Sequence, residues 1–121
     1  MKSIKARWLT YMMCRKGKFD AEQRYQIYTG FRWYELTVEQ VSVYAKATMS
    51  AEQMRTCKHA LAKEFSIPEM KEWIGLGLSE YKFKSIIEAR LNGISKELIM
   101  DCAQKESSDE EFFYEYIQLS L

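Results

Sequence analysis

Two copies of one helix-start pattern lie in the stretch LTVEQVSVYAKATMSAEQM, residues 36–54. In each copy an apolar residue precedes a hydroxyl residue, and a glutamine and a second apolar residue follow. The hydroxyl side chain can accept a hydrogen bond from the glutamine N–H, the glutamine side chain can bond back, and the two apolar side chains can pack together. The stretch therefore predicts two short helices, which begin at Thr37 and Ser50.

The same pattern recurs along the chain at intervals of 29 or 30 residues. One frame begins at Phe19, Met49, Leu78 and Ser107, and the other begins at Leu36, Phe65 and Ile94. Repetition at this period is typical of stacked helical units that bury their apolar faces against their neighbours. The sequence therefore predicts an all-α fold, a compact array of about eight short helices in four helix pairs of about 30 residues. We expect helices near residues 2–15, 20–33, 37–47, 50–63, 66–75, 79–91, 95–104 and 108–120.

Length and composition predict one helical-repeat domain over residues 1–121, because a chain with 47% apolar residues can bury a substantial core. No apolar run is long enough to span a membrane, and residues 1–19 lack the features of a signal peptide, so we expect a cytoplasmic protein.

The three cysteines form no CxxC pair, which indicates free thiols. Cys14 and Cys102 share a repeat position with two large aromatic residues, Tyr44 and Trp73, so these two cysteines are interpreted as packing residues.

Charge is distributed unevenly along the chain. Residues 1–34 carry a net charge of +6, residues 35–105 are neutral, and residues 106–121 carry −5. A basic end attracts nucleic acid, an anionic membrane or an acidic protein, and an acidic end can contact the basic end of another copy. Self-association through the oppositely charged ends is therefore one expectation.

Catalytic motifs are absent from the sequence. The single histidine, His59, lies two residues from Cys57 on an expected helix, which turns the two side chains to different faces. No HExxH, CxxC, GxxxxGK or GxSxG pattern is present to form a metal, phosphate or nucleophile site. We therefore expect no catalytic residues, no metal, no cofactor and no enzymatic activity.

Aromatic and basic residues are interleaved over residues 1–34. The favoured interpretation places the aromatic side chains in the core of the first two repeats and the basic side chains on the solvated rim. The alternative is a DNA- or RNA-binding surface, because cations contact phosphates and rings stack on bases. The cations that would form this surface are Lys16, Lys18, Arg24 and Arg32.

Two further patterns have alternative interpretations. Residues 85–99 have the spacing of a helix-turn-helix, although Glu97 and Asp101 are unfavourable beside DNA and the same junction recurs throughout the array. The first expected helix places Ile4, Trp8 and Tyr11 on one side and basic residues elsewhere, as a membrane-surface helix does. An end helix of the array has the same pattern, and this second interpretation is preferred.

Residues 35–61, ELTVEQVSVYAKATMSAEQMRTCKHAL, resemble a short helical repeat that reads approximately GLSxEQVxxYAxPxFSxxQMxxIRxGL. This repeat occurs in tandem in proteins of conjugative elements and phages of Gram-positive bacteria. The chain has Ala47 where the repeat has proline, and Lys58 to Ala60 replace its IRxG stretch. The resemblance implies a mobile-element accessory protein, for which inhibition of a host nuclease or defence complex is a fitting task, and it implies no catalytic residues.

The sequence thus favours a non-enzymatic module that binds a protein partner, with an anti-CRISPR-type inhibitor as the most specific version. Exposed aromatic residues would anchor the partner, because such side chains dominate interface energetics. The candidate anchors are Trp33, Tyr34, Phe113 and Tyr114.

Overall fold

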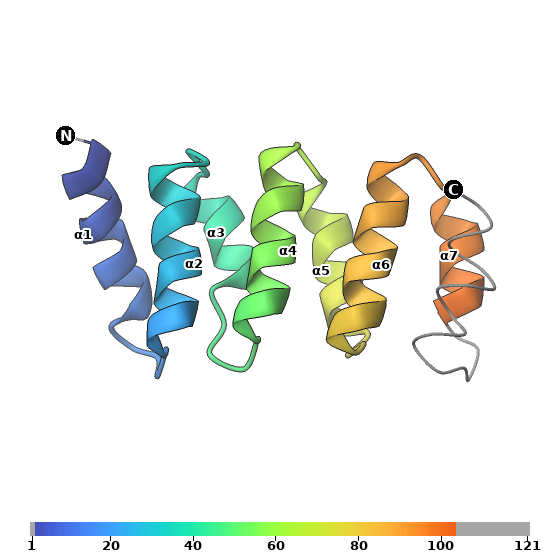
Figure 1. Ribbon diagram of the computed structural model, residues 1–121, viewed down its shortest axis with the longest axis horizontal. Coiled ribbons are helices and arrows are strands. Elements are labelled where there is room, and N and C mark those ends of the chain that lie inside the picture. The colour runs from blue at the N-terminus through green and yellow to red at the C-terminus, as the bar shows by residue number, and fades with distance from the viewer. Residues whose placement is uncertain (1, 104–121) are drawn as a thin grey trace. The chain divides into compact units, whose positions relative to one another are not determined.

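The computed structural model describes residues 2–103, which form seven α-helices and no strand (Figure 1). The helices are α1 (Lys2–Cys14), α2 (Ala21–Arg32), α3 (Val38–Tyr44), α4 (Ala51–Ala62), α5 (Ile67–Gly75), α6 (Glu80–Leu91) and α7 (Lys96–Ala103). The prediction of an all-α helical array is confirmed, and each of these helices begins and ends within three residues of its expected bounds. The eighth expected helix, residues 108–120, lies outside the described residues.

The chain divides into two compact units, Met1–Glu72 and Trp73–Leu121, with the boundary inside α5. In the first unit α2 lies between α1 and α4, and α3 packs against both α2 and α4 (Figure 1). In the second unit α6 packs against α7. A single domain over residues 1–121 stays a prediction.

Side-chain caps form at six of the expected helix starts. In each, a side-chain oxygen accepts a hydrogen bond from the backbone N–H three residues later, which satisfies a donor that has no partner inside the helix. The capping residues are Asp20, Thr37, Ser50, Ser66, Ser79 and Ser95. At Asp20 and Thr37 the glutamine side chain bonds back and completes a capping box.

Three helix ends recur with the same period as the helix starts. Glu35, Glu64 and Gly93, spaced by 29 residues, adopt the left-handed conformation with φ of 53°, 65° and 89°. The next residue then bonds back into the preceding helix, as the Phe65 N–H does to the Ala60 carbonyl at 3.1 Å. At Glu64 and Gly93 this is the Schellman helix end, whereas the Leu36 N–H after Glu35 bonds one residue further back, to the Gly30 carbonyl. In all three cases the apolar residue that bonds back is also the first residue of the next helix-start pattern. One residue therefore ends one helix and orients the next.

The core of the first unit is formed by apolar side chains from α2, α3 and α4, and Tyr44 is fully buried within it. The Tyr44 hydroxyl donates to the Gln26 carbonyl at 2.8 Å, and a Cβ on Gly30 would overlap that hydroxyl. In the second unit Trp73 is fully buried. The two aromatic residues at this repeat position are core residues, whereas Cys14, which was expected to pack in the same way, is only half-buried. The side chain of Cys102 lies outside the described residues.

Candidate functional site

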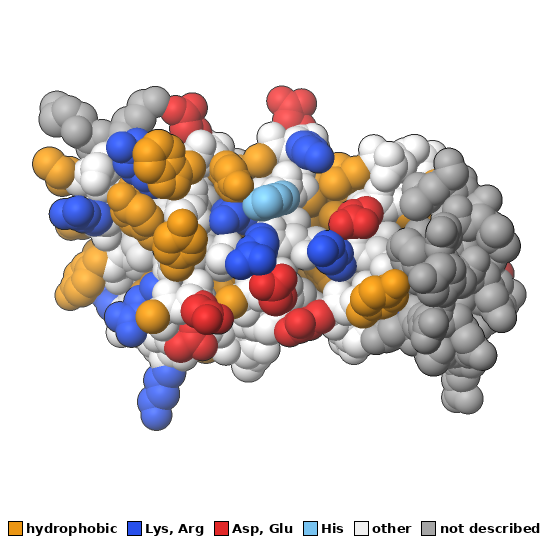
Figure 2. All heavy atoms as spheres, viewed as in Figure 1, with side chains coloured by type: hydrophobic (Ala, Val, Ile, Leu, Met, Phe, Trp, Pro, Cys, Tyr) orange, Lys and Arg blue, Asp and Glu red, His pale blue; other side chains and the backbone are white. Residues whose placement is uncertain are grey.

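Four aromatic side chains of the first unit are largely exposed: Trp8 (60%), Tyr11 (64%), Tyr25 (60%) and Trp33 (65%). The interpretation that the aromatic residues of residues 1–34 form the core is therefore wrong for these four. For Trp8 and Tyr11 the reason is that α1 buries the small side chain of Ala6, at 2% exposure, and a helix that buries one face leaves the opposite face to solvent. Figure 2 shows hydrophobic and basic side chains interleaved over α1 and α2.

Trp33 and Tyr34 follow directly after α2, and each ring lies beside a cation. The Arg32 guanidinium lies 4.3 Å from the centroid of the Trp33 ring, and the Lys58 Nζ lies 4.9 Å from the centroid of the Tyr34 ring. Cations at these distances are attracted to the negative face of the ring and hold it in place. We call these two aromatic residues, with Arg32, Lys58 and His59, the Trp33–Tyr34 site.

Lys58 is an unusual component of this site, because its side chain is only 5% exposed. Its Nζ donates to the Gln26 Oε1 at 2.7 Å and to the Thr29 Oγ1 at 3.0 Å, so both hydrogen-bond acceptors are neutral side chains of α2. Burial, and secondarily the positive charge of Arg55, lower the pKa of Lys58 from 10.5 to about 8. The protein thus buries a cation at the α2–α4 contact, directly beneath the Tyr34 ring.

His59 completes the support of Tyr34. Its Nε2 lies 3.0 Å from the Tyr34 hydroxyl, and the two rings meet edge to face with centroids 5.2 Å apart. Burial lowers the pKa of His59, and the charges of Lys58, Arg55 and Lys63 lower it further. The His59 ring is consequently neutral around pH 7, which allows an imidazole nitrogen to pair with the Tyr34 hydroxyl.

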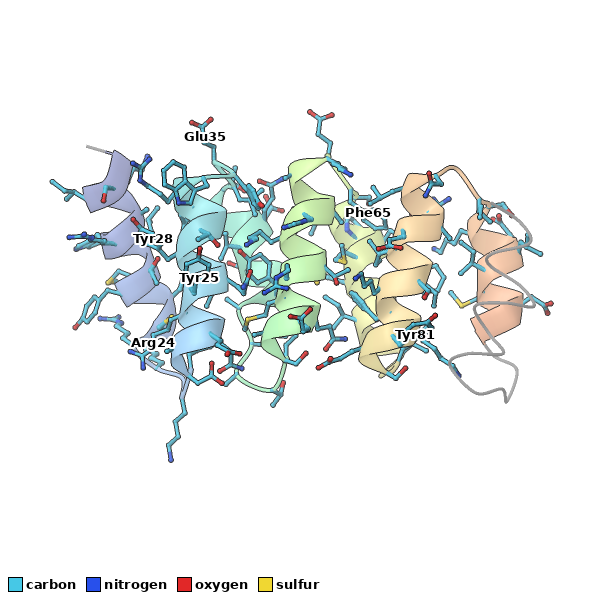
Figure 3. The ribbon with its side chains drawn as sticks, in the orientation of Figure 1. Arg24, Tyr25, Tyr28, Glu35, Phe65 and Tyr81 are labelled. Atoms are coloured by element: carbon cyan, nitrogen blue, oxygen red, sulfur yellow. The ribbon has the colours of Figure 1, made fainter. Side chains whose placement is uncertain are left out.

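Tyr28 and Tyr25 extend the aromatic surface along α2 (Figure 3). A hydrogen bond with Ser3 of α1 is the main cause of a lowered pKa for Tyr28, and the charges of Arg32 and Arg7 contribute. A groove of about 410 Å³ lies between the starts of α2 and α4. It is lined by Tyr25, Gln26 and Arg55, among other residues. Tyr25 therefore borders a groove at the start of α2, whereas Trp33 and Tyr34 follow the other end of that helix.

The structure places the expected site residues in two groups. Trp33, Tyr34 and Arg32 lie together at the end of α2. Lys16, Lys18 and Arg24 are exposed near the start of the same helix. Eight residues of helix separate Arg24 from Arg32, a rise of about 12 Å, so the four expected nucleic-acid contacts do not form one cluster. Phe113 and Tyr114 lie outside the described residues.

Sequence reasoning missed Lys58 and its two acceptors, Gln26 and Thr29. A signal was present, because a shift of 29 residues aligns Lys58 with Ile87, which is 1% exposed in the core of the second unit. A lysine at an apolar repeat position indicates a buried cation with dedicated partners. The partners themselves lie 29 and 32 residues away in the chain and are brought close only by the packing of α2 on α4.

Cys57 and His59 both lie on α4, but they do not share a face of that helix. Cys57 is buried and His59 is exposed, so the two side chains face different surroundings.

Between residues 2 and 103, no group of three or more His, Cys, Asp or Glu side chains is arranged to hold a metal ion. Within the same range, no helix has the length and apolar character that a membrane span requires. In α7, Glu97 and Asp101 are exposed, on the helix that would read DNA in a helix-turn-helix.

No protein-family model, no curated protein and no solved structure matches this chain. Function is therefore inferred from the geometry and charge of the described residues.

Proposed function

We propose that this chain is a non-enzymatic macromolecule-binding protein, and that a partner protein docks on the Trp33–Tyr34 site. The observation that carries the proposal is the pair of neighbouring rings, 65% and 37% exposed, each held by a cation of the same chain. Aromatic and arginine side chains contribute most to interface affinity when a partner covers them. A ring that is already held loses little conformational freedom on binding, so more of its contact energy appears as affinity.

Charge suggests the kind of partner surface. Residues 1–72 contain thirteen Lys and Arg against eight Asp and Glu, a net charge of +5. Arg55 of α4 and Lys63, the residue that follows α4, are exposed near Lys58 and His59 in the chain. A partner with an acidic surface around an apolar centre would complement this arrangement, and its association rate would fall as salt is added.

The resemblance of residues 35–61 to tandem repeats of mobile-element proteins supports a more specific proposal. In that context the partner is a host nuclease or defence complex, and the protein is a counter-defence inhibitor of the anti-CRISPR type. Inhibition by binding requires no catalytic group in the inhibitor, so it is compatible with the site described above.

The test is affinity purification of the tagged chain from its host, with and without nuclease, followed by mass spectrometry of the bound proteins. We expect a stoichiometric protein that survives nuclease and no longer binds after Trp33→Ala and Tyr34→Ala. The matched control is Trp8→Ala, which removes a tryptophan of similar exposure from α1, outside the Trp33–Tyr34 site. A partner retained by the Trp33 and Tyr34 variants would contradict the proposed site.

The second candidate function is binding of single-stranded nucleic acid. The observation in its favour is that residues 16–25 carry three exposed cations, Lys16, Lys18 and Arg24, together with the exposed ring of Tyr25. Phosphates would contact the cations, and a base would stack on the ring.

Binding of labelled single-stranded oligonucleotides, measured over a range of salt concentrations, tests this candidate. If it is correct, affinity falls steeply with added salt. Replacement of Lys16, Lys18 and Arg24 by glutamine then reduces the salt slope by about 0.7 for each phosphate that the variant no longer binds. Affinity that does not change in the triple variant would exclude this surface.

A further inference from the structure

We propose that the first helix of one copy binds the acidic segment 106–121 of a second copy. The binding surface is the α1 stripe, which consists of Ile4, Trp8 and Tyr11. Their exposed fractions are 69%, 60% and 64%. Their spacing of four and three residues places all three side chains on one face of α1.

The α1 stripe lies on the opposite side of the helix from the face that contacts α2. Ala6, at 2% exposure, is on the buried side, and two positions separate it from both Ile4 and Trp8. Stacked helical repeats expose polar residues at a solvated end and apolar residues on a face that a further repeat covers. The composition of the α1 stripe is that of a covered face.

Charge complementarity identifies the occupant. Lys5, Arg7 and Arg15 are exposed on and beside α1, within a unit whose net charge is +5. Residues 106–121 carry five acidic residues and no basic residue. Oppositely charged segments attract one another over roughly a Debye length, so this pair would be steered together at low salt.

Aromatic content makes the match more specific. The acidic segment contains the run FFYEYI, residues 112–117, in which five of six residues are aromatic or aliphatic. Aromatic pairs gain energy beyond the area that they bury, and basic side chains around them can contact the acidic residues of the segment. Both the α1 stripe and the basic side chains around it therefore find counterparts in one segment of the same chain.

The symmetry of such an interface is head to tail. Each copy carries one stripe and one acidic segment, so the surfaces that meet are different, and each added copy uses one of its surfaces and leaves the other free for the next copy. The result is a ring or an open chain of copies rather than a simple twofold dimer.

The test is sedimentation velocity of the full chain over a range of concentrations, at about 0.05 M and about 0.5 M NaCl, where the Debye lengths are roughly 14 Å and 4 Å. We expect the average mass to rise with concentration at low salt and to approach that of the monomer at high salt. Trp8→Ala with Tyr11→Ala should weaken self-association by at least about tenfold. The control Trp33→Ala should leave it unchanged, because Trp33 follows α2 and is not part of the α1 stripe.

A complementation experiment separates head-to-tail pairing from other modes. The first variant carries Trp8→Ala with Tyr11→Ala and keeps its acidic segment. The second carries Glu110→Lys with Glu111→Lys and keeps its α1 stripe. Each variant alone should be a monomer, and an equimolar mixture should form a one-to-one dimer, which also shows that both variants are folded.

Three results would overturn the proposal. The first is a wild-type mass equal to that of the monomer at every concentration in low salt. The second is self-association unaffected by the Trp8 and Tyr11 substitutions, and the third is a mixture of the two variants that stays monomeric. If the wild type is a monomer and sediments with anionic lipid vesicles, and if Trp8→Ala abolishes this binding, the α1 stripe binds a membrane surface instead. Because this surface does not include Trp33 or Tyr34, failure here leaves the proposed partner site untouched.

Discussion

Glu64 ends α4 in a backbone conformation that suits glycine. Its φ of 65° lies in the left-handed region, where a Cβ crowds the following carbonyl at a cost of about 1 to 2 kcal/mol. Gly93 occupies the same repeat position at the end of α6 without that cost.

Glu64→Gly is therefore expected to stabilise the protein. The gain should be about 0.5 to 1 kcal/mol, since the strain relieved exceeds the extra freedom that glycine gives the unfolded chain. Urea denaturation measures the difference, with Lys63→Gly as the control, because Lys63 has φ of −95° and no left-handed strain to relieve. An equal or larger gain from Lys63→Gly would show that strain at Glu64 is not the cause.

The lowered pKa of Lys58 predicts that the stability of the protein depends on pH. In the folded protein its pKa is about 8, whereas the usual value is 10.5. Between these values the unfolded chain binds more protons than the folded protein, so the free energy of unfolding should rise with pH. The expected rise is about 1 kcal/mol between about pH 7 and about pH 9, measured by denaturant unfolding.

Cys57 acts in the opposite direction at the upper end of this range. Burial raises the pKa of its thiol from 9.0 to about 12, so the unfolded chain loses this proton first and stability falls with pH. Lys58→Met isolates the lysine contribution, because Cys57 is present in both proteins. The rise in stability with pH should be absent from Lys58→Met, and a rise of the same size in that variant would assign it to another group.

At the scale of the helices, Gln23 connects α2 to the loop before α4. Its side chain accepts a hydrogen bond from the Asp20 N–H at 2.8 Å and donates to the carbonyls of Ala47 and Met49 at 3.0 Å and 2.8 Å. One glutamine thus caps its own helix and satisfies two acceptors of a distant loop. Gln40 has the same double role, because it completes the cap at Thr37 and donates to the Leu61 carbonyl at 3.3 Å.

Gln23→Ala is expected to destabilise the protein by about 2 to 3 kcal/mol, because it removes half of a capping box and leaves partly buried carbonyls without a donor. The matched control is Gln53→Ala at the equivalent position of α4, where the cap bond is made by the Gln53 backbone N–H, which alanine keeps. We expect the control to cost less than about 1 kcal/mol in thermal or urea denaturation. Equal losses at the two positions would mean that the bonds to Ala47 and Met49 contribute little.

These helix-level features separate what the sequence could predict from what it could not. The start of α3 at Thr37 was predictable, because capping depends on residues three positions apart. The left-handed residue Glu64 was not, because the Schellman conformation is normally signalled by glycine. The repeat alignment of Lys58 with Ile87 indicates that Lys58 is buried, but its partners Gln26 and Thr29 depend on how α2 packs against α4, and no local pattern encodes that packing.

At the scale of the whole molecule, the two compact units share one continuous helix. The boundary between Glu72 and Trp73 lies inside α5, which runs from Ile67 to Gly75. Met70 and Trp73 are both fully buried, so this helix contributes core side chains on each side of the boundary. In repeat proteins, coupling of this kind between neighbouring units produces cooperative unfolding.

We therefore expect one calorimetric transition, with equal calorimetric and van't Hoff enthalpies, for the full chain. Lys71→Pro tests the coupling, because proline in the interior of α5 removes a helical hydrogen bond and costs about 3 kcal/mol. The variant should unfold in two transitions, one for each unit, whereas Lys71→Ala at the same exposed position should keep one. Two transitions in the wild type would instead mean that α5 does not couple the units, and the expectation of a single domain over residues 1–121 would be wrong.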